Sequence, residues 1–230
     1  MRSLQVTTPH MKCIYNCPFC ISKSHKHDNK FDDNYHNNPD LWKKNLINVL
    51  KDNKDLKYVV ITGTNEPMQS KDCVSDIIKI VRKYRSDIQI EIQTRYYQEN
   101  DIYNSIDVVC YSISNYKLIN KIKLVNKKNR FVFILTDSFN NVMLNDIINM
   151  LPENVQELTF KILHNSNGDN IKMDEWIGNH KIDDIAKGRL KEDINTYTGN
   201  LSIMFDANCM DAKGRYKIFR EDGNIYEDWG

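Results

Sequence analysis

The sequence predicts an α/β protein whose fold is a partial (β/α)6 TIM-type barrel with a C-terminal strand and hairpin extension. Three observations lead to this fold class. Strand-like and helical segments alternate about six times, which is typical of parallel βα units. Such units take right-handed crossovers and wind into an open sheet or a barrel. A complete eight-unit barrel needs about 250 residues, whereas the alternation here ends near residue 163 of 230.

The expected strands are short apolar runs between polar or turn residues. They cover residues 4–7, 57–63, 88–94, 107–113, 131–136, 157–163 and 201–206. The expected helices carry apolar residues that recur every three or four positions. They cover residues 38–53, 72–84, 116–127, 142–151 and the region near 182–197.

Local signals support the ends of this series. Asn38 followed by Pro39 places a cap residue before a proline at the first helical position. Near the C-terminus, two alternating runs flank Asp222 and Gly223, which predicts a β-hairpin. We expect one domain, in which residues 1–165 form the core of the partial barrel. Residues 166–230 would add a helix, a strand and the hairpin that close it.

The composition is that of an ordinary soluble protein, with 40% hydrophobic and 27% charged residues. A formal net charge of +1 predicts no general binding to nucleic acid. The longest apolar runs, such as residues 108–110, are too short to span a membrane. The first residues lack the apolar stretch of a signal peptide. We therefore expect a cytoplasmic location, where the six cysteines are metal ligands or free thiols rather than disulfides.

Polar residues interrupt several expected strands at every second position, and a period of two places each pair on one strand face. The pairs are Glu91 with Gln93, Ser112 with Ser114, and Thr159 with Lys161. If this face lines a barrel, the interior is polar near the carboxyl ends of the strands, where barrel active sites lie. The alternative is that some of these residues are edge residues or hydrogen-bonded core residues.

Three cysteines follow the first expected strand with the spacing C-x3-C-x2-C: Cys13, Cys17 and Cys20. A structural zinc site takes four ligands, so zinc would need a histidine as well. The histidines nearby are His10, His25 and His27. Electron-transfer clusters also use four cysteines, and the next one here is Cys73. A cubane held by three thiols would leave one iron free to bind a small molecule.

The segment CIYNCPFC at residues 13–20, with Phe19 before the last cysteine, resembles the cluster motif of the radical S-adenosylmethionine (SAM) superfamily. The segment ITGTNEP at residues 61–67 resembles the glycine-glycine-glutamate-proline segment of that family. The resemblance covers roughly residues 4–165. Because the other cysteines form no second motif, it points to a compact, single-cluster member.

The resemblance implies an oxygen-sensitive [4Fe–4S] cluster, SAM as cosubstrate, and a low-potential electron donor of the flavodoxin or ferredoxin type. Reductive cleavage of SAM would give a 5′-deoxyadenosyl radical that abstracts hydrogen from an unidentified substrate. That substrate would be a peptide, a protein or a nucleotide-like small molecule. The alternative is a zinc-binding protein or an iron–sulfur electron carrier without SAM chemistry.

By this resemblance, Cys13, Cys17 and Cys20 match the cluster ligands. The positions that match or could complete a SAM site are Phe19, Thr64, Asn65, Glu66, Gln93, Ser112 and Lys161. The first four follow the family motifs, whereas the last three are chosen from the polar strand faces. Cys209 lies after the last expected strand and could return a hydrogen atom to a substrate radical. The alternative for Cys209 is a small buried apolar residue.

Overall fold

The structure is a computed structural model that describes residues 2–17, 20, 31–162, 190–197, 199–206 and 216–229. The chain divides into two compact units. The first unit comprises Met1–Tyr96, Asn100–Val109 and Met210–Gly230. The second comprises Tyr97–Glu99 and Cys110–Cys209. The predicted boundary between residues 165 and 166 lies outside the described residues.

The first unit is built on parallel strands that bring the two ends of the chain together. Its strands are β1 (Ser3–Thr8), β2 (Tyr58–Gly63), β3 (Gln89–Thr94), β9 (Lys217–Phe219) and β10 (Ile225–Tyr226). They are ordered β10-β9-β1-β2-β3. β9, β1, β2 and β3 are parallel to one another, and β10 pairs antiparallel with β9. The predicted strands in this part of the chain and the C-terminal hairpin are confirmed.

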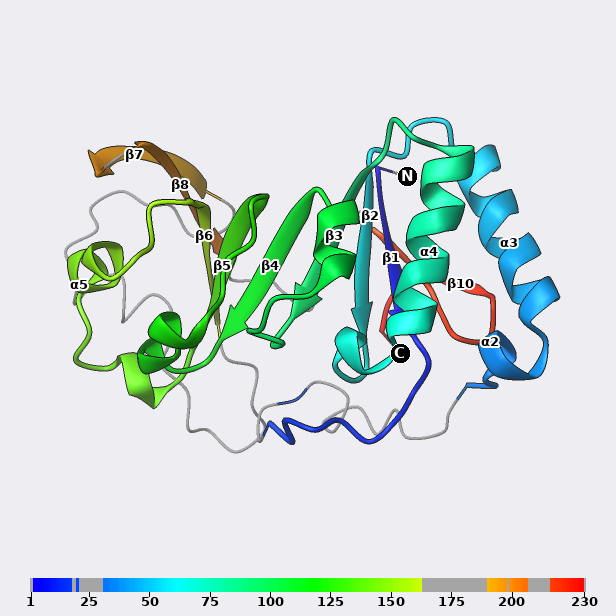
Figure 1. Cartoon of the computed structure of the whole chain (residues 1–230), viewed down its shortest axis with the longest axis horizontal. Helices are drawn as coiled ribbons and strands as arrows, with labels where there is room; N and C mark the ends of the chain where they lie inside the picture. The colour runs from blue at the N-terminus through cyan, green and yellow to red at the C-terminus, as the bar shows by residue number, and fades with distance from the viewer. Residues whose placement is uncertain are drawn as a thin grey trace. The chain divides into compact units, whose positions relative to one another are not determined.

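Helices cover this sheet and supply its core. They are α2 (Asn34–Asn37), α3 (Pro39–Asp52), α4 (Lys71–Tyr84) and the 3-10 turns η1 (Pro67–Gln69) and η2 (Asp101–Ser105). Figure 1 shows α4 beside β1 and β2, with α3 next to α4. The buried residues of α4 recur at helical spacing, as predicted: Cys73, Val74, Ile77, Ile78, Ile80 and Val81. The apolar face of α4 therefore packs into the core.

Trp42 of α3 joins the helical layer to the C-terminal hairpin. Its side chain is fully buried. Its Nε1 donates a hydrogen bond of 3.2 Å to the carbonyl of Arg220. Its ring lies edge-on to Phe219 of β9, with centroids 5.3 Å apart. The hairpin is therefore part of the core of the first unit.

The second unit contains the other strands of the ten-stranded sheet. The boundary between the units falls within β4 (Val108–Ile113), between Val109 and Cys110. The remaining strands are β5 (Lys128–Leu135), β6 (Val155–Ile162), β8 (Gly199–Asp206) and β7 (Leu190–Tyr197). β5, β6 and β8 are parallel, and β7 is antiparallel to β8. Helix α5 (Leu144–Asn149) and the turns η3 (Tyr116–Lys121) and η4 (Asp137–Phe139) complete the described elements of this unit. Its core is aromatic, with Phe133 stacked on Phe160 at 5.0 Å.

Two predicted helices are wrong in whole or in part. The helix predicted over residues 116–127 is only the 3-10 turn η3, because the amide of Lys123 bonds to the carbonyl of Tyr97 and the chain then enters β5. The region predicted as a helix near 182–197 contains strand β7, which pairs with β8 from Leu190 opposite Phe205 onward. Residues 182–189 lie outside the described residues.

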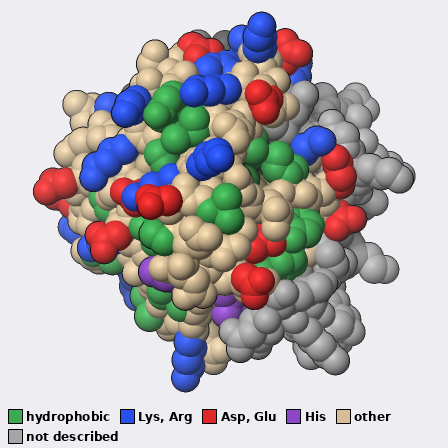
Figure 2. All heavy atoms as spheres, turned by 90° about the vertical axis from the view of Figure 1, so that its right-hand side faces the viewer, with side chains coloured by type: hydrophobic (Ala, Val, Ile, Leu, Met, Phe, Trp, Pro, Cys, Tyr) green, Lys and Arg blue, Asp and Glu red, His purple; other side chains and the backbone are tan. Residues whose placement is uncertain are grey.

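The surface of the first unit carries charges of both signs. Figure 2 shows the face on the α3 side of Figure 1, where basic and acidic side chains are interspersed with small groups of hydrophobic ones. Within the described part of the chain, no helix has the length and apolar character needed to cross a membrane.

Candidate functional site

The three motif cysteines lie in the loop that leaves β1. Cys13, Cys17 and Cys20 are half-buried free thiols, and Cys13 and Cys20 both interact electrostatically with Cys17. Asn16 adopts a left-handed conformation with φ of 45°, which asparagine tolerates better than most residues. The amide of Cys20 bonds to the carbonyl of Cys17 at 3.3 Å. The loop thus turns sharply just before Cys17, and the Cys17 thiol lies within electrostatic range of the other two thiols.

Gln69 at the end of η1 holds the first part of this loop. Its Nε2 donates to the carbonyl of Lys12 at 3.1 Å, and its Oε1 accepts from the amide of Ile14 at 3.0 Å. One side-chain amide therefore bonds to the backbone on both sides of Cys13. These two hydrogen bonds satisfy backbone groups as a neighbouring strand would, and they restrain the backbone at Cys13.

The loop that follows β2 lies against the exit of β1. Gly63 is close to Thr8: a Cβ at Gly63 would lie 2.7 Å from Thr8 Oγ1. Thr8 Oγ1 donates to Asn65 Oδ1 at 3.3 Å, and Thr64 Oγ1 is 3.0 Å from His10 Nδ1. Asn65 is 8% exposed, and its Nδ2 has no hydrogen-bond partner among the described residues. The loop thus offers a buried amide donor beside the exit of β1.

Glu66 ties this loop to the end of β3. It is 3% exposed. Its Oε1 accepts from Thr94 Oγ1 at 2.5 Å and from the amide of Met68 at 3.1 Å. Its Oε2 accepts from the amide of Arg95 at 2.7 Å. Burial raises the pKa of the Glu66 carboxyl, although these hydrogen bonds favour the charged form. Three internal donors therefore position this carboxylate.

Arg95 brings a positive charge to the cysteine loop. It follows β3 directly, and its Nη1 donates to the sulfur of Cys17. Its guanidinium lies over the ring of Tyr15, 5.4 Å from the centroid. Burial raises the pKa of the Cys17 thiol, and Arg95 acts in the opposite direction. The loops after β1, β2 and β3 therefore meet at one place in the first unit.

The other predicted site residues are distributed over both units. Gln93 is half-buried on β3 in the first unit. Ser112 and Lys161 are half-buried on β4 and β6 in the second unit. The carbonyl of Ser112 accepts a hydrogen bond from Tyr97 Oη at 2.5 Å. Residues outside the described part of the chain are Phe19, His25, His27 and Cys209. The assignments of these residues stay predictions.

Two residues of the site, Gln69 and Arg95, are missing from the sequence-based set. Arg95 carries a signal that could have found it, because it directly follows a parallel strand, and sites gather at the carboxyl ends of such strands. Gln69 carries no such signal, because its role depends on the spatial approach of η1 to the cysteine loop.

The side chains present suit an iron–sulfur cluster with SAM. Thiolates are the usual ligands of such clusters, and three lie in one loop. The buried Nδ2 of Asn65 is a hydrogen-bond donor that could meet a carboxylate oxygen. Among the described residues, no group of three or more His, Cys, Asp or Glu is arranged to hold a single metal ion.

The chain is similar in fold to solved structures with bound SAM. It matches Streptococcus suis SuiB bound to S-adenosylmethionine with a TM-score of 0.62 and 16% identity, over 99% of this chain and 60% of that one. A further SuiB structure gives 0.60 and 15% over the same shares. A structure of anSMEcpe with bound AdoMet gives 0.59 and 12%, over 79% of this chain and 60% of that one.

These neighbours are radical SAM enzymes with partial TIM barrels. The predicted fold class is therefore confirmed. The fold agrees with the resemblance of the cysteine motif to the radical SAM superfamily. The chain spans 60% of the length of each of these structures. No family model and no curated protein matches the sequence.

Proposed function

We propose that this chain is a radical SAM enzyme that holds one [4Fe–4S] cluster on Cys13, Cys17 and Cys20. The observation that carries the proposal is the meeting of three free thiols with the loops after β2 and β3, in a fold shared with SAM-bound radical SAM enzymes. When bound, such a cluster supplies one electron to SAM, which splits into methionine and a 5′-deoxyadenosyl radical. The electron would come from a flavodoxin or ferredoxin, and the substrate is a peptide, a protein or a nucleotide-like small molecule.

The loop after β2 is proposed to hold the methionine part of SAM. Asn65 Nδ2 is a buried donor with no hydrogen-bond partner among the described residues, and an amide donor suits the carboxylate of SAM. Glu66 has three internal donors, so its first task is to keep this loop against β3. Thr64 is oriented by His10. Phe19 is proposed to meet the adenine and Gln93 the ribose, whereas the predicted roles of Ser112 and Lys161, which belong to the second unit, stay predictions.

Metal and product analysis test the proposal. Anaerobically reconstituted protein is expected to hold about four iron and four sulfide per chain and to form 5′-deoxyadenosine slowly from SAM and dithionite. Cys17→Ala should lose both properties. Cys73→Ala is the matched control, because Cys73 is buried in α4 and should keep both. Deoxyadenosine formation undiminished in Cys17→Ala would remove Cys17 as a ligand.

The same samples separate the proposal from its alternatives. Stoichiometric zinc in protein from anaerobically lysed cells would favour the zinc-binding protein. Iron and sulfide without any SAM cleavage would favour an electron carrier. Asn65→Ala should weaken SAM binding while the iron content stays normal, and unchanged SAM binding would contradict the role given to Asn65.

Cys209 is proposed as a hydrogen donor to the substrate radical. Cys209→Ala should keep the cluster and deoxyadenosine formation and should stop or divert the product. In D2O the wild-type product should carry one solvent deuteron, because thiol hydrogens exchange rapidly. Normal product at the normal rate from Cys209→Ala would show that this thiol is not the donor.

A further inference from the structure

Arg95 is a charged side chain that contacts the cysteine motif directly, because it donates a hydrogen bond to a predicted cluster ligand. The Nη1 of Arg95 bonds to the sulfur of Cys17. Neither the cysteine motif nor the segment after β2 includes this residue. Its contact therefore raises the question of what a fixed positive charge does beside this thiol.

Arg95 is held in place from three directions. Its backbone amide donates to Glu66 Oε2 at 2.7 Å. The residue before it, Thr94, donates to the other oxygen of Glu66 and accepts from the amide of Tyr96 at 2.9 Å. The guanidinium lies over the ring of Tyr15 in the cysteine loop itself. The first two sets of bonds fix the backbone at Arg95, and the contact with Tyr15 restrains the guanidinium, whose planar group loses less freedom per hydrogen bond than a lysine ammonium.

The electrostatic consequence follows from the charge on the ligands. Reduction of a thiolate-held cluster takes up one electron from the donor and makes the site more negative by one charge. A nearby guanidinium and an N–H···S hydrogen bond stabilise the more negative state, and hydrogen bonds to the sulfurs are among the factors that set cluster potentials. Partial burial strengthens both contributions, because water screens the charge less.

We propose that Arg95 is a positioning residue that tunes the cluster: its guanidinium, bonded to the Cys17 sulfur, raises the reduction potential and so eases the entry of the electron that SAM cleavage needs. This inference rests on the proposed function. It also gives Glu66 a second task, since the carboxylate that shapes the loop after β2 also positions Arg95. The SAM loop and the cluster ligand are thereby linked through two residues.

A redox titration without SAM tests this proposal. The potential of reconstituted protein is followed by the electron paramagnetic resonance signal of the reduced cluster, with dithionite as reductant. In Arg95→Met the equilibrium constant for one-electron reduction is expected to fall about tenfold, which corresponds to a shift of about 59 mV to lower potential. Arg95→Lys, which keeps the charge and a donor, should lie between this variant and the wild type.

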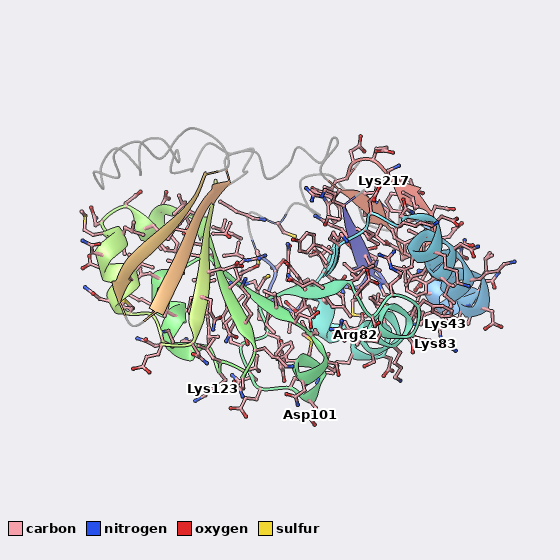
Figure 3. All side chains as sticks on the ribbon, turned by 90° about the horizontal axis from the view of Figure 1, so that it is seen from above. Lys43, Arg82, Lys83, Asp101, Lys123 and Lys217 are labelled. Atoms are coloured by element: carbon pink, nitrogen blue, oxygen red, sulfur yellow. The ribbon has the colours of Figure 1, made fainter. Side chains whose placement is uncertain are left out.

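Lys83→Met is the matched control. It removes one positive charge from an exposed position on α4, where Figure 3 shows Lys83 on the helical layer of the first unit. Its contact is with the ring of Tyr84. The potential of this variant should equal that of the wild type. An equal shift in Lys83→Met and Arg95→Met would mean that net charge alone sets the potential, and would overturn the proposal.

The remaining outcomes also distinguish the inference about Arg95 from the proposed function. A potential unchanged in Arg95→Met overturns the inference while the proposed function stands. A wild-type protein that takes up no cluster overturns the proposed function and the inference with it. If Arg95→Met and Arg95→Lys both fold, as judged by circular dichroism, but neither takes up the cluster, Arg95 is needed for assembly and its tuning role is wrong.

Discussion

Gln69 and Gly63 act on the site through the backbone and not through chemistry of their own. Gln69 uses both ends of one amide to hold the residues before and after Cys13. Gly63 lets β2 approach Thr8 closely, since a Cβ there would meet Thr8 Oγ1 at 2.7 Å and Asn65 Oδ1 at 3.0 Å. The positions of the thiols and of the loop after β2 therefore depend on residues that act through the backbone and through close packing.

Gln69→Ala should loosen the cysteine loop even without metal. The amide of Ile14 loses its acceptor, and a lost hydrogen bond of about 1 kcal/mol corresponds to about fivefold faster opening. Hydrogen exchange at the Ile14 amide in the metal-free protein measures this effect. Gln98→Ala, at an exposed glutamine, is the control. Equal exchange at Ile14 in both variants would mean that Gln69 does not hold the loop.

Gly63→Ala should destabilise the fold, because the new Cβ forces Thr8 and Asn65 to move in a closely packed loop. We expect a loss of about 1–3 kcal/mol in the free energy of unfolding, measured by urea denaturation. Adding Thr8→Ala to Gly63→Ala removes the Oγ1 that would clash and should restore part of the loss. No recovery in the double variant would argue against this clash as the cause.

At the scale of elements, the pairing of β5 with β6 carries an ionic cluster on Glu157. Arg130 lies opposite Glu157 in the register. Arg130 Nε bonds to Glu157 Oε2 at 2.6 Å, and Lys128 Nζ lies 2.7 Å from Oε1. Burial alone would raise the pKa of Glu157, but Arg130 and Lys128 outweigh it and hold this pKa below its usual range. Two adjacent strands are thus joined by charge as well as by backbone bonds.

This cluster predicts a pH dependence with a definite sign. A carboxyl whose pKa is lower in the folded state stabilises the fold above its unfolded pKa of about 4.3 and loses that contribution as pH falls through the folded pKa. Glu157→Gln should therefore reduce the acid sensitivity of urea unfolding below about pH 4.3. Glu153→Gln, at an exposed glutamate before β6, is the control. Equal acid sensitivity in Glu157→Gln and the wild type would contradict this role.

Helices and strands with a strong hydrophobic period could be predicted from the sequence. Elements whose structure depends on pairing or packing with distant segments could not. The apolar stripe of α4 and the buried runs of β2 and β4 carry their structure in local sequence. β7 does not, because a polar segment becomes a strand through its pairing with β8. The segment from Tyr116 onward buries Ile119, Ile122 and Val125 as its helical spacing predicts, but only its first part is helical. Tertiary contacts there override local preference.

The residues of the candidate site also fall into those that local sequence predicts and those that it does not. The cysteines and the segment at residues 61–67 were found because they belong to motifs with fixed spacing. The role of Arg95 depends on β3 ending beside the cysteine loop, and that of Gln69 on the approach of η1. Local patterns in one sequence do not encode such approaches, which are set by the packing of parallel strands.

At the scale of the molecule, the first unit is assembled from both ends of the described chain. β9 adds to β1 in parallel, with Val6 opposite Phe219. Thr7 Oγ1 donates to Glu221 Oε2 at 2.8 Å, and both residues are buried. The strand that leads into the cysteine loop is therefore flanked by β2 on one side and by the C-terminal hairpin on the other.

Phe219→Ala should destabilise the first unit by about 3–5 kcal/mol, because Phe219 is fully buried against Trp42. Phe160→Ala, in the aromatic core of the second unit, is the matched variant. Tryptophan fluorescence, to which Trp42 contributes, and far-ultraviolet circular dichroism follow the two losses during urea denaturation. A stability of Phe219→Ala equal to that of the wild type would mean that the hairpin is not part of the core.

The pairing of β1 with β9 also affects when the first unit can be completed during synthesis of the chain. A ribosome that adds about 5–20 residues per second needs on the order of 10–40 s to travel from Thr7 to Glu221, which are 214 positions apart. During that interval the cysteine motif has emerged while one edge of its strand still lacks a neighbour. Under the proposed function, insertion of the cluster into a finished site would follow the synthesis of β9. Until then, oxygen or a competing metal could reach the thiols of the nascent chain.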